Sequence, residues 1–165
     1  MVKLWNLTEL ERKYSEPDSN PEPYLTLRGH TGPLLAIEGV SSSRDQSKNQ
    51  NIVFTAGVEG SIHVWNIPQI SDVNVYGDTK DGENFCVEVW SDESPEAIWS
   101  LKYHPFQDLL LSINACSQIV VWDCGNIDKT SSCEKTGKVK KRFELAAIEG
   151  KKLDPPTCCS WLPTH

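Results

Sequence analysis

Basic residues are scarce in this chain relative to acidic ones. Its 165 residues include 16 lysines and arginines against 23 aspartates and glutamates, for a formal net charge of −7. Surfaces that bind nucleic acid or anionic membranes need a basic footprint. We therefore expect neither nucleic acid nor a membrane among the partners. The one dense basic run, KVKKR at 138–142, is expected to be the solvated face of a strand, with a localisation signal as the alternative.

Long apolar runs and paired cysteine motifs are also missing. No apolar stretch approaches the roughly 20 residues of a membrane-spanning helix, and the N-terminal MVKLWNL lacks a signal-peptide layout. We therefore expect a cytoplasmic protein. The six cysteines form no C-x-x-C pair, which favours reduced, buried thiols over disulfides or a zinc site. The adjacent Cys158 and Cys159 cannot form an unstrained disulfide, and metal binding or oxidation of that pair is the alternative.

Motifs of catalysis are missing as well. The sequence has no G-x-G-x-x-G, no P-loop and no metal-ligand spacing. The histidines are isolated, and none lies beside a nucleophile in a known elbow motif. His63 alternates with apolar residues and is expected to face solvent from a strand. We predict no enzyme activity, no cofactor, and no catalytic, cofactor-binding or metal site.

What the chain does have is a strand pair that recurs. The segment NIVFTAGVEGSIHVWNI at 51–67 predicts two short strands, because it is rich in β-branched residues with a period of two, joined by a turn containing Gly57 and Gly60. VKLWN, IHVWN and IVVWD repeat one pattern, with tryptophans at 5, 65 and 122. Self-similarity at long period indicates a repeat architecture.

About eleven short strands and no helix are predicted along the chain. We label the four strands of one repeat unit a, b, c and d in chain order. The chain then contains strands c and d of one unit, two complete units, and strand a of a fourth. The expected strands are 2–7, 24–27, 34–37, 52–55, 61–65, 84–89, 97–103, 108–113, 118–122, 140–146 and 156–162.

A four-stranded meander that is apolar on both faces cannot bury both alone, and radial stacking of such units gives a β-propeller. We therefore expect an all-β fold, a partial propeller with two complete four-stranded blades and two incomplete ones. The expected blades are 1–29 (incomplete), about 30–90, about 91–147, and the start of another at 156–165. Such a piece of a longer propeller exposes apolar sides, so in isolation we expect it to self-associate or to stay partly unfolded.

The residues resemble the WD-repeat family of propellers. Gly29-His30 precedes strand a, and Trp65-Asn66 closes strand c. The resemblance implies a buried hydrogen-bond network of His30, Thr55, Glu59 and Trp65, with Glu59 where Asp is usual. In the next unit Ser94 stands at the His position and Cys116 at the Asp position, which leaves only Ser112 and Trp122.

Within that family, PYLTLRGHTGPLLAI, HVWNIPQISDVNVYGD and AIWSLKYHPFQDLLLS are similar to stretches of striatin propellers. The resemblance implies a non-enzymatic scaffold for protein–protein interaction. It also implies protein phosphatase 2A subunits and Ste20-type kinases as partners in signalling complexes. The alternative is an enzyme or small-ligand binder that uses a propeller channel.

Turns of an antiparallel meander alternate between the two ends of its strands. The long connections at 8–23, 41–51, 68–83 and 124–137 then lie at one end, and the tight turns at the other. Long loops are usually disordered or functional, and both readings stay open.

Overall fold

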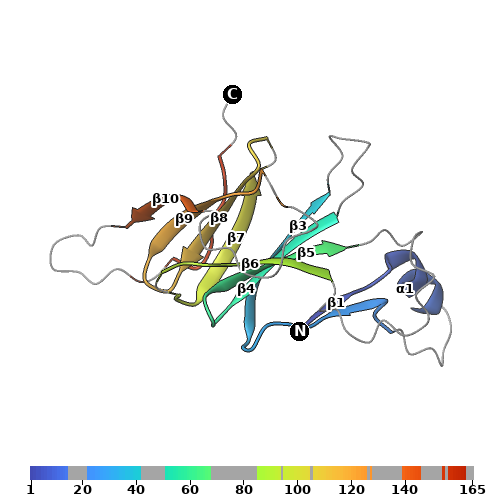
Figure 1. The fold of residues 1–165 in the computed structure, drawn as a ribbon. Coiled ribbons are helices and arrows are strands. Elements are labelled where there is room, and N and C mark those ends of the chain that lie inside the picture. Colours follow the sequence, from blue (N-terminus) through green and yellow to red (C-terminus); the bar gives the residue numbers. More distant parts are fainter. Residues whose placement is uncertain are drawn as a thin grey trace.

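The structure is a computed structural model. It describes residues 1–14, 22–41, 51–67, 85–93, 95–104, 106–125, 127, 139–145, 154 and 156–162. Within these ranges the chain forms ten strands and one short helix (Figure 1). No helix among them is long and apolar enough to span a membrane.

Eight of the strands make two four-stranded antiparallel sheets, each connected as a simple meander. This confirms the all-β, four-stranded organisation predicted from the repeats. The first sheet contains β3 (Leu34–Ser41), β4 (Asn51–Gly57), β5 (Ser61–Ile67) and β6 (Cys86–Ser91). The second contains β7 (Ile98–His104), β8 (Leu109–Asn114), β9 (Gln118–Asp123) and β10 (Val139–Glu144).

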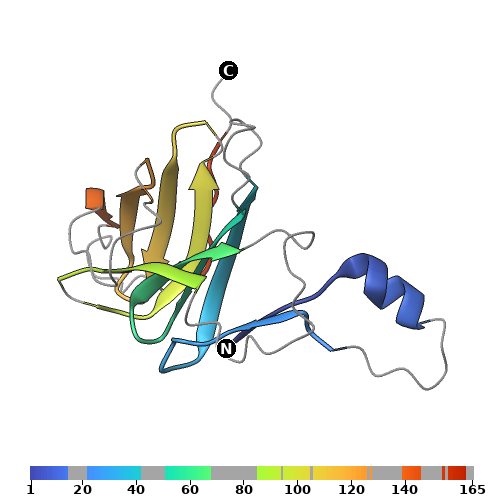
Figure 2. The same ribbon diagram turned by 45° about the vertical axis from the view of Figure 1, so that its right-hand side comes forward.

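The main core lies between the two sheets. Trp90 of the first sheet stacks on Trp122 of the second at 6.0 Å between ring centroids, and Phe54 packs against both Trp90 and Tyr103. Each large side chain that is fully buried here contributes about 1.5–3 kcal/mol. The first strands of the two sheets, β3 and β7, run side by side (Figure 2). Each sheet therefore supplies the cover that the other needs.

A third, two-stranded sheet pairs β1 (Val2–Leu4) with β2 (Leu25–Leu27). Together with Trp65 and Ile67 of the first sheet, these strands form a second buried cluster. The expected loop after β1 is wrong at its start, because α1 (Leu7–Tyr14) is a helix that projects away from the sheets (Figure 2). Asn6 caps it: the backbone N–H of Thr8 donates to Asn6 Oδ1 at 3.0 Å.

The strand expected at 156–162 is also wrong. This segment has no regular secondary structure and belongs to no sheet, because its contacts use side chains instead of a backbone ladder. The Cys159 N–H donates to Ser100 Oγ at 3.3 Å, and Trp161 Nε1–H donates to the Lys102 carbonyl at 2.9 Å. It nevertheless lies against β7, and it covers a small apolar cluster on β8 and β9.

Trp5 does not match its counterparts at 65 and 122. Its side chain is 39% exposed, whereas the other two are 0% and 1% exposed. The reason is that β1 pairs only with β2 among the described residues, so no strand on its other edge supplies a hydroxyl partner for an indole.

The five described cysteines are free thiols, as predicted, but only Cys124 is also buried. Cys86 and Cys159 are partly buried, and Cys116 and Cys158 are exposed because they lie in a turn and in a segment that belongs to no sheet. Cys133 lies outside the described residues. Burial raises the pKa of the Cys159 thiol.

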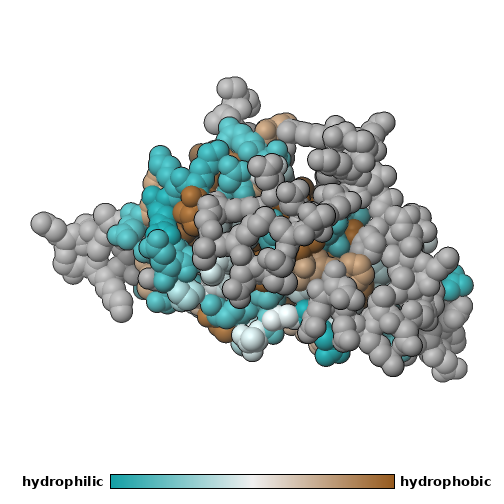
Figure 3. Space-filling view, in the orientation of Figure 1, coloured by the Kyte–Doolittle hydropathy of each residue, from teal (hydrophilic) through white to brown (hydrophobic). Residues whose placement is uncertain are grey.

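Residues 139–142 of the basic run lie on the exposed outer strand β10, as predicted, at a hydrophilic end of the molecule (Figure 3). The tight turns meet at one end, where a Cβ on Gly60 would lie 2.6 Å from the Glu96 backbone nitrogen. The long connections at 42–50 and 68–83, residues 15–21 of the connection at 8–23, and most of the connection at 124–137 lie outside the described residues.

Candidate functional site

The first sheet carries a chain of buried hydrogen bonds that starts at Trp65. Thr55 on β4 pairs with His63 on β5, so its side chain lies diagonal to Trp65, two residues further along the same face. Both side chains are 0% exposed, and Trp65 Nε1–H donates to Thr55 Oγ1 at 2.7 Å. The indole N–H therefore has the partner that a buried tryptophan requires.

His30 continues this chain from the segment that leads into β3. Its side chain is 2% exposed. Its Nε2 lies 2.6 Å from Thr55 Oγ1, and its Nδ1 contacts the Glu59 carboxylate. One arrangement satisfies every group: Trp65 donates to Thr55, the Thr55 hydroxyl donates to His30 Nε2, and His30 Nδ1–H donates to Glu59. The structure thus brings together all four residues named for this blade from the sequence.

The turn between β4 and β5 presents Glu59 to His30. Gly60 has a φ of +74°, a region that glycine adopts without strain. At Gly57 a Cβ would lie 2.2 Å from the Pro33 carbonyl oxygen, so this close approach also requires glycine. Glu59 Oε2 is buried without a hydrogen-bond partner among the described residues. Burial tends to raise the pKa of the Glu59 carboxyl, but its bond to His30 and the nearby histidines lower it overall.

His63 is not solvent-facing, so that prediction was wrong. Its side chain is only 8% exposed, because the residues before β3 cover the face of β5 on which it lies. The ring stacks on His30 with centroids 3.8 Å apart, and Nδ1 lies 3.9 Å from Cys86 Sγ. Burial, with the neighbouring His30, lowers the pKa of His63 to about 4, so the ring is neutral near pH 7.

Together these contacts create a ligand set that the sequence spacing did not indicate. His30, Glu59 and His63 each have a ligand atom within 4.8 Å of the others. The three residues are far apart in the sequence. They come together only because the segment before β3, the turn between β4 and β5, and β5 itself meet in the fold. The imidazole and carboxylate groups are of the types that bind zinc.

The second sheet carries a shorter version of the chain. Trp122 Nε1–H donates to Ser112 Oγ at 2.8 Å. Cys116 is exposed, and the turn is held instead by Asn114, whose Oδ1 accepts the N–H groups of Cys116 and Gln118 at 3.1 and 2.9 Å. Ser94, which aligns with His30, lies outside the described residues.

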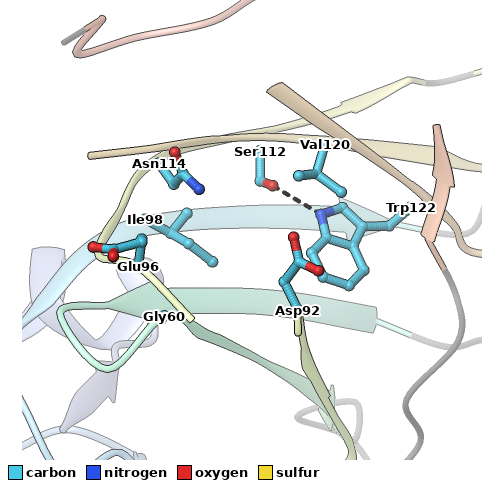
Figure 4. Close-up of a pocket in the computed structure, with 8 residues that line it drawn as sticks. All are labelled: Gly60, Asp92, Glu96, Ile98, Ser112, Asn114, Val120 and Trp122. Atoms are coloured by element: carbon cyan, nitrogen blue, oxygen red, sulfur yellow. Dashed lines mark hydrogen bonds between the residues drawn. The ribbon is translucent and has the colours of Figure 1, made fainter. Parts of the chain in front are cut away.

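Next to Ser112 is a small cavity of about 10 Å³ (Figure 4). Asp92, Glu96 and Asn114 contribute polar atoms to its lining, and Trp122 closes one side. A cavity of this volume holds about one water molecule. It is too small for a substrate.

Two acids, the buried Glu88 and the partly buried Glu38, escaped the sequence analysis. Glu88 is 1% exposed and accepts a hydrogen bond from Trp90 Nε1–H at 2.7 Å. Glu38 on β3 accepts the Tyr103 backbone N–H at 3.1 Å and pairs with Lys102 at 3.0 Å, which ties the two inner strands together. Alternation along β6 puts Glu88 on the same face as Trp90, a signal that was available in the sequence.

Stacked four-stranded meanders, each with a tryptophan bonded to a strand hydroxyl ten residues earlier, are the features of a WD-repeat protein. No protein-family model matches the chain. It is 30% identical over 122 residues to a striatin homolog of Dictyostelium discoideum and equally to striatin-3 of Rattus norvegicus. It is 24% identical over 139 residues to human striatin-4.

The chain is thus similar to one part of the striatins, which are WD-repeat proteins. The first two matches cover 74% of this chain and 14% of each relative, and the match to human striatin-4 covers 80% and 16%. The chain thus corresponds to a small part of the length of the relatives it matches.

Proposed function

We propose that this chain is a non-enzymatic scaffold that holds signalling proteins together, with protein phosphatase 2A subunits and Ste20-type kinases as its partners. The observation that carries the proposal is its similarity to striatins, which extends over 74% of its length. The described sheets support this proposal, because the indole N–H groups of Trp65, Trp90 and Trp122 are each hydrogen-bonded within the fold.

We further propose that the two four-stranded sheets are consecutive blades of a WD-repeat propeller. Then β1 and β2 are the outer strands of the preceding blade, and 156–162 contributes the inner segment of the following one. Three contacts support this order: β2 packs on the first sheet, β3 lies beside β7, and Trp161 lies against β7. Each layer covers the next in chain order.

In this proposal the buried network makes the surface rigid. His30 and Glu59 link the segment before β3 to the turn after β4, and Arg142 of β10 pairs with Asp92 after β6. Turns fixed in this way present a preformed surface, which reduces the ordering cost of binding.

Direct binding tests the proposal. The full chain would be immobilised, and purified phosphatase 2A subunits and a Ste20-type kinase domain would each be passed over it at physiological salt. We expect saturable binding of at least one of them. The matched control is Trp122→Ala, which disrupts the core between the sheets and should abolish binding that needs the folded surface. Saturable binding that survives this change, or no binding of either protein, would contradict the proposal and leave only a scaffold with other partners.

A further inference from the structure

We propose that His30, Glu59 and His63 form a binding site for a divalent transition-metal ion, with zinc as the best match. The three residues come from three different elements: the segment before β3, the turn between β4 and β5, and β5 itself. A bound ion would therefore fasten these elements to one another.

The donor set matches zinc chemistry. Two imidazoles and one carboxylate are a known set of three zinc ligands, which leaves a fourth position open. One ligand atom from each residue lies within 4.8 Å of the others. Tetrahedral zinc with bonds of about 2.0–2.2 Å needs ligand atoms about 3.4 Å apart, so the three groups must draw together by about an ångström. Glu59 can make this movement because it lies in a turn.

Two of the groups have coordination capacity to spare. Glu59 Oε2 is buried without a hydrogen-bond partner among the described residues, which is costly for a carboxylate oxygen unless a cation or donor satisfies it. The ring nitrogens of His63 have no oxygen or nitrogen hydrogen-bond partner in the part of the chain that the structure describes, and Nδ1 makes only a long contact of 3.9 Å with Cys86 Sγ.

His30 can bind the ion without leaving its network. The ion would replace the proton that lies between His30 Nδ1 and Glu59. His30 Nε2 would then carry the ring proton and donate it to Thr55 Oγ1, which lies 2.6 Å away. Histidine ligands of metals commonly donate their second ring N–H in this way, which fixes the orientation of the ring. Thr55 Oγ1 has two lone pairs, so it can accept from Trp65 and His30 together.

Metal titration of the full chain tests the site. After removal of metals with a chelator, Zn²⁺ binding would be measured by calorimetry, and Co²⁺ would be added as a spectroscopic probe. We expect one ion per chain, the visible absorption bands of tetrahedral Co²⁺, and a higher melting temperature with Zn²⁺. His63→Gln and Glu59→Gln should each weaken Zn²⁺ binding at least tenfold and remove the Co²⁺ bands.

His104→Gln is the matched control, because His104 lies at the far end of β7 beside Trp161 and should leave binding unchanged. His63→Gln leaves the bonds from Trp65 to Glu59 intact, so it should fold even if the change at Glu59 is harmful. Absence of Zn²⁺ binding in the original chain would overturn the proposal. So would affinity that is unchanged in His63→Gln or lost equally in His104→Gln.

Discussion

The two four-stranded sheets share a plan but differ in how far the hydrogen bonds run from the tryptophan. In the first sheet the bonds continue from Trp65 through Thr55 to His30 and Glu59. In the second they stop at Ser112, and a cavity of about 10 Å³ adjoins it. The strands fix the tryptophan–hydroxyl pair, whereas the rest of the network depends on what the preceding segment and the turn supply.

Removal of either tryptophan should have the largest effect. Both are essentially fully buried, so Trp65→Ala and Trp122→Ala should each lower the free energy of unfolding by about 3–5 kcal/mol. Urea denaturation of the full chain measures this directly. Because Trp122 also packs on Trp90 between the sheets, its loss should be at least as costly. A loss below about 1 kcal/mol at either position would contradict the burial described here.

Removal of the hydroxyl that bonds each tryptophan should lower the free energy of unfolding more in the first sheet than in the second. Thr55→Val leaves both Trp65 Nε1–H and His30 Nε2 without a partner, so we expect a loss of about 2–4 kcal/mol. Ser112→Ala leaves only Trp122 Nε1–H without its partner, and the adjacent cavity lets a water molecule reach this group. The loss should therefore be about 1 kcal/mol. Equal losses of unfolding free energy for the two variants in urea denaturation would show that the longer network adds no stability.

Acid should weaken the first sheet more than the second. The pKa of His63 is about 4 in the folded chain against 6.5 for an ordinary histidine, so the unfolded state binds an extra proton between these values. Stability is then complete above the unfolded pKa and falls as pH drops towards 4. The lowered pKa of Glu59 acts in the same direction at the acid end.

We expect His63 to contribute a loss on the order of 2 kcal/mol between about pH 7 and pH 4.5. Urea denaturation across this range measures it. His63→Gln should flatten the profile. A profile that keeps its slope in His63→Gln would place the titrating group elsewhere.

The sequence predicts most of this architecture because apolar residues recur at every second position along a strand that has one buried face. It therefore located β3 to β10 within a few residues, and it indicated the bonding partners of Trp65. It could not show which face of β5 meets solvent, because that depends on residues before β3 that cover His63. The helix α1 was missed although Asn6 and Glu9 have the spacing of a capping box. Residues 156–162 have the apolar composition of a strand. The sequence does not reveal that this segment contacts β7 through side chains and joins no sheet.

The smallest expected effect concerns one position that the two sheets share. Gly60 and Ser117 each immediately precede the third strand of their sheet, and both have positive φ, +74° and 61°. Glycine adopts this conformation freely, whereas serine is strained there by about 1–2 kcal/mol. Ser117→Gly should therefore stabilise the second sheet, by about 0.5–1 kcal/mol after the greater entropy of unfolded glycine is allowed for.

The reverse exchange, Gly60→Ser, should destabilise the first sheet by more than this, because its Cβ would lie 2.6 Å from the Glu96 backbone nitrogen. Melting temperatures of both variants and of the double exchange would measure the two effects. If Ser117→Gly lowers the melting temperature, then the Ser117 side chain contributes a contact worth more than its backbone strain, and the two turns are not equivalent.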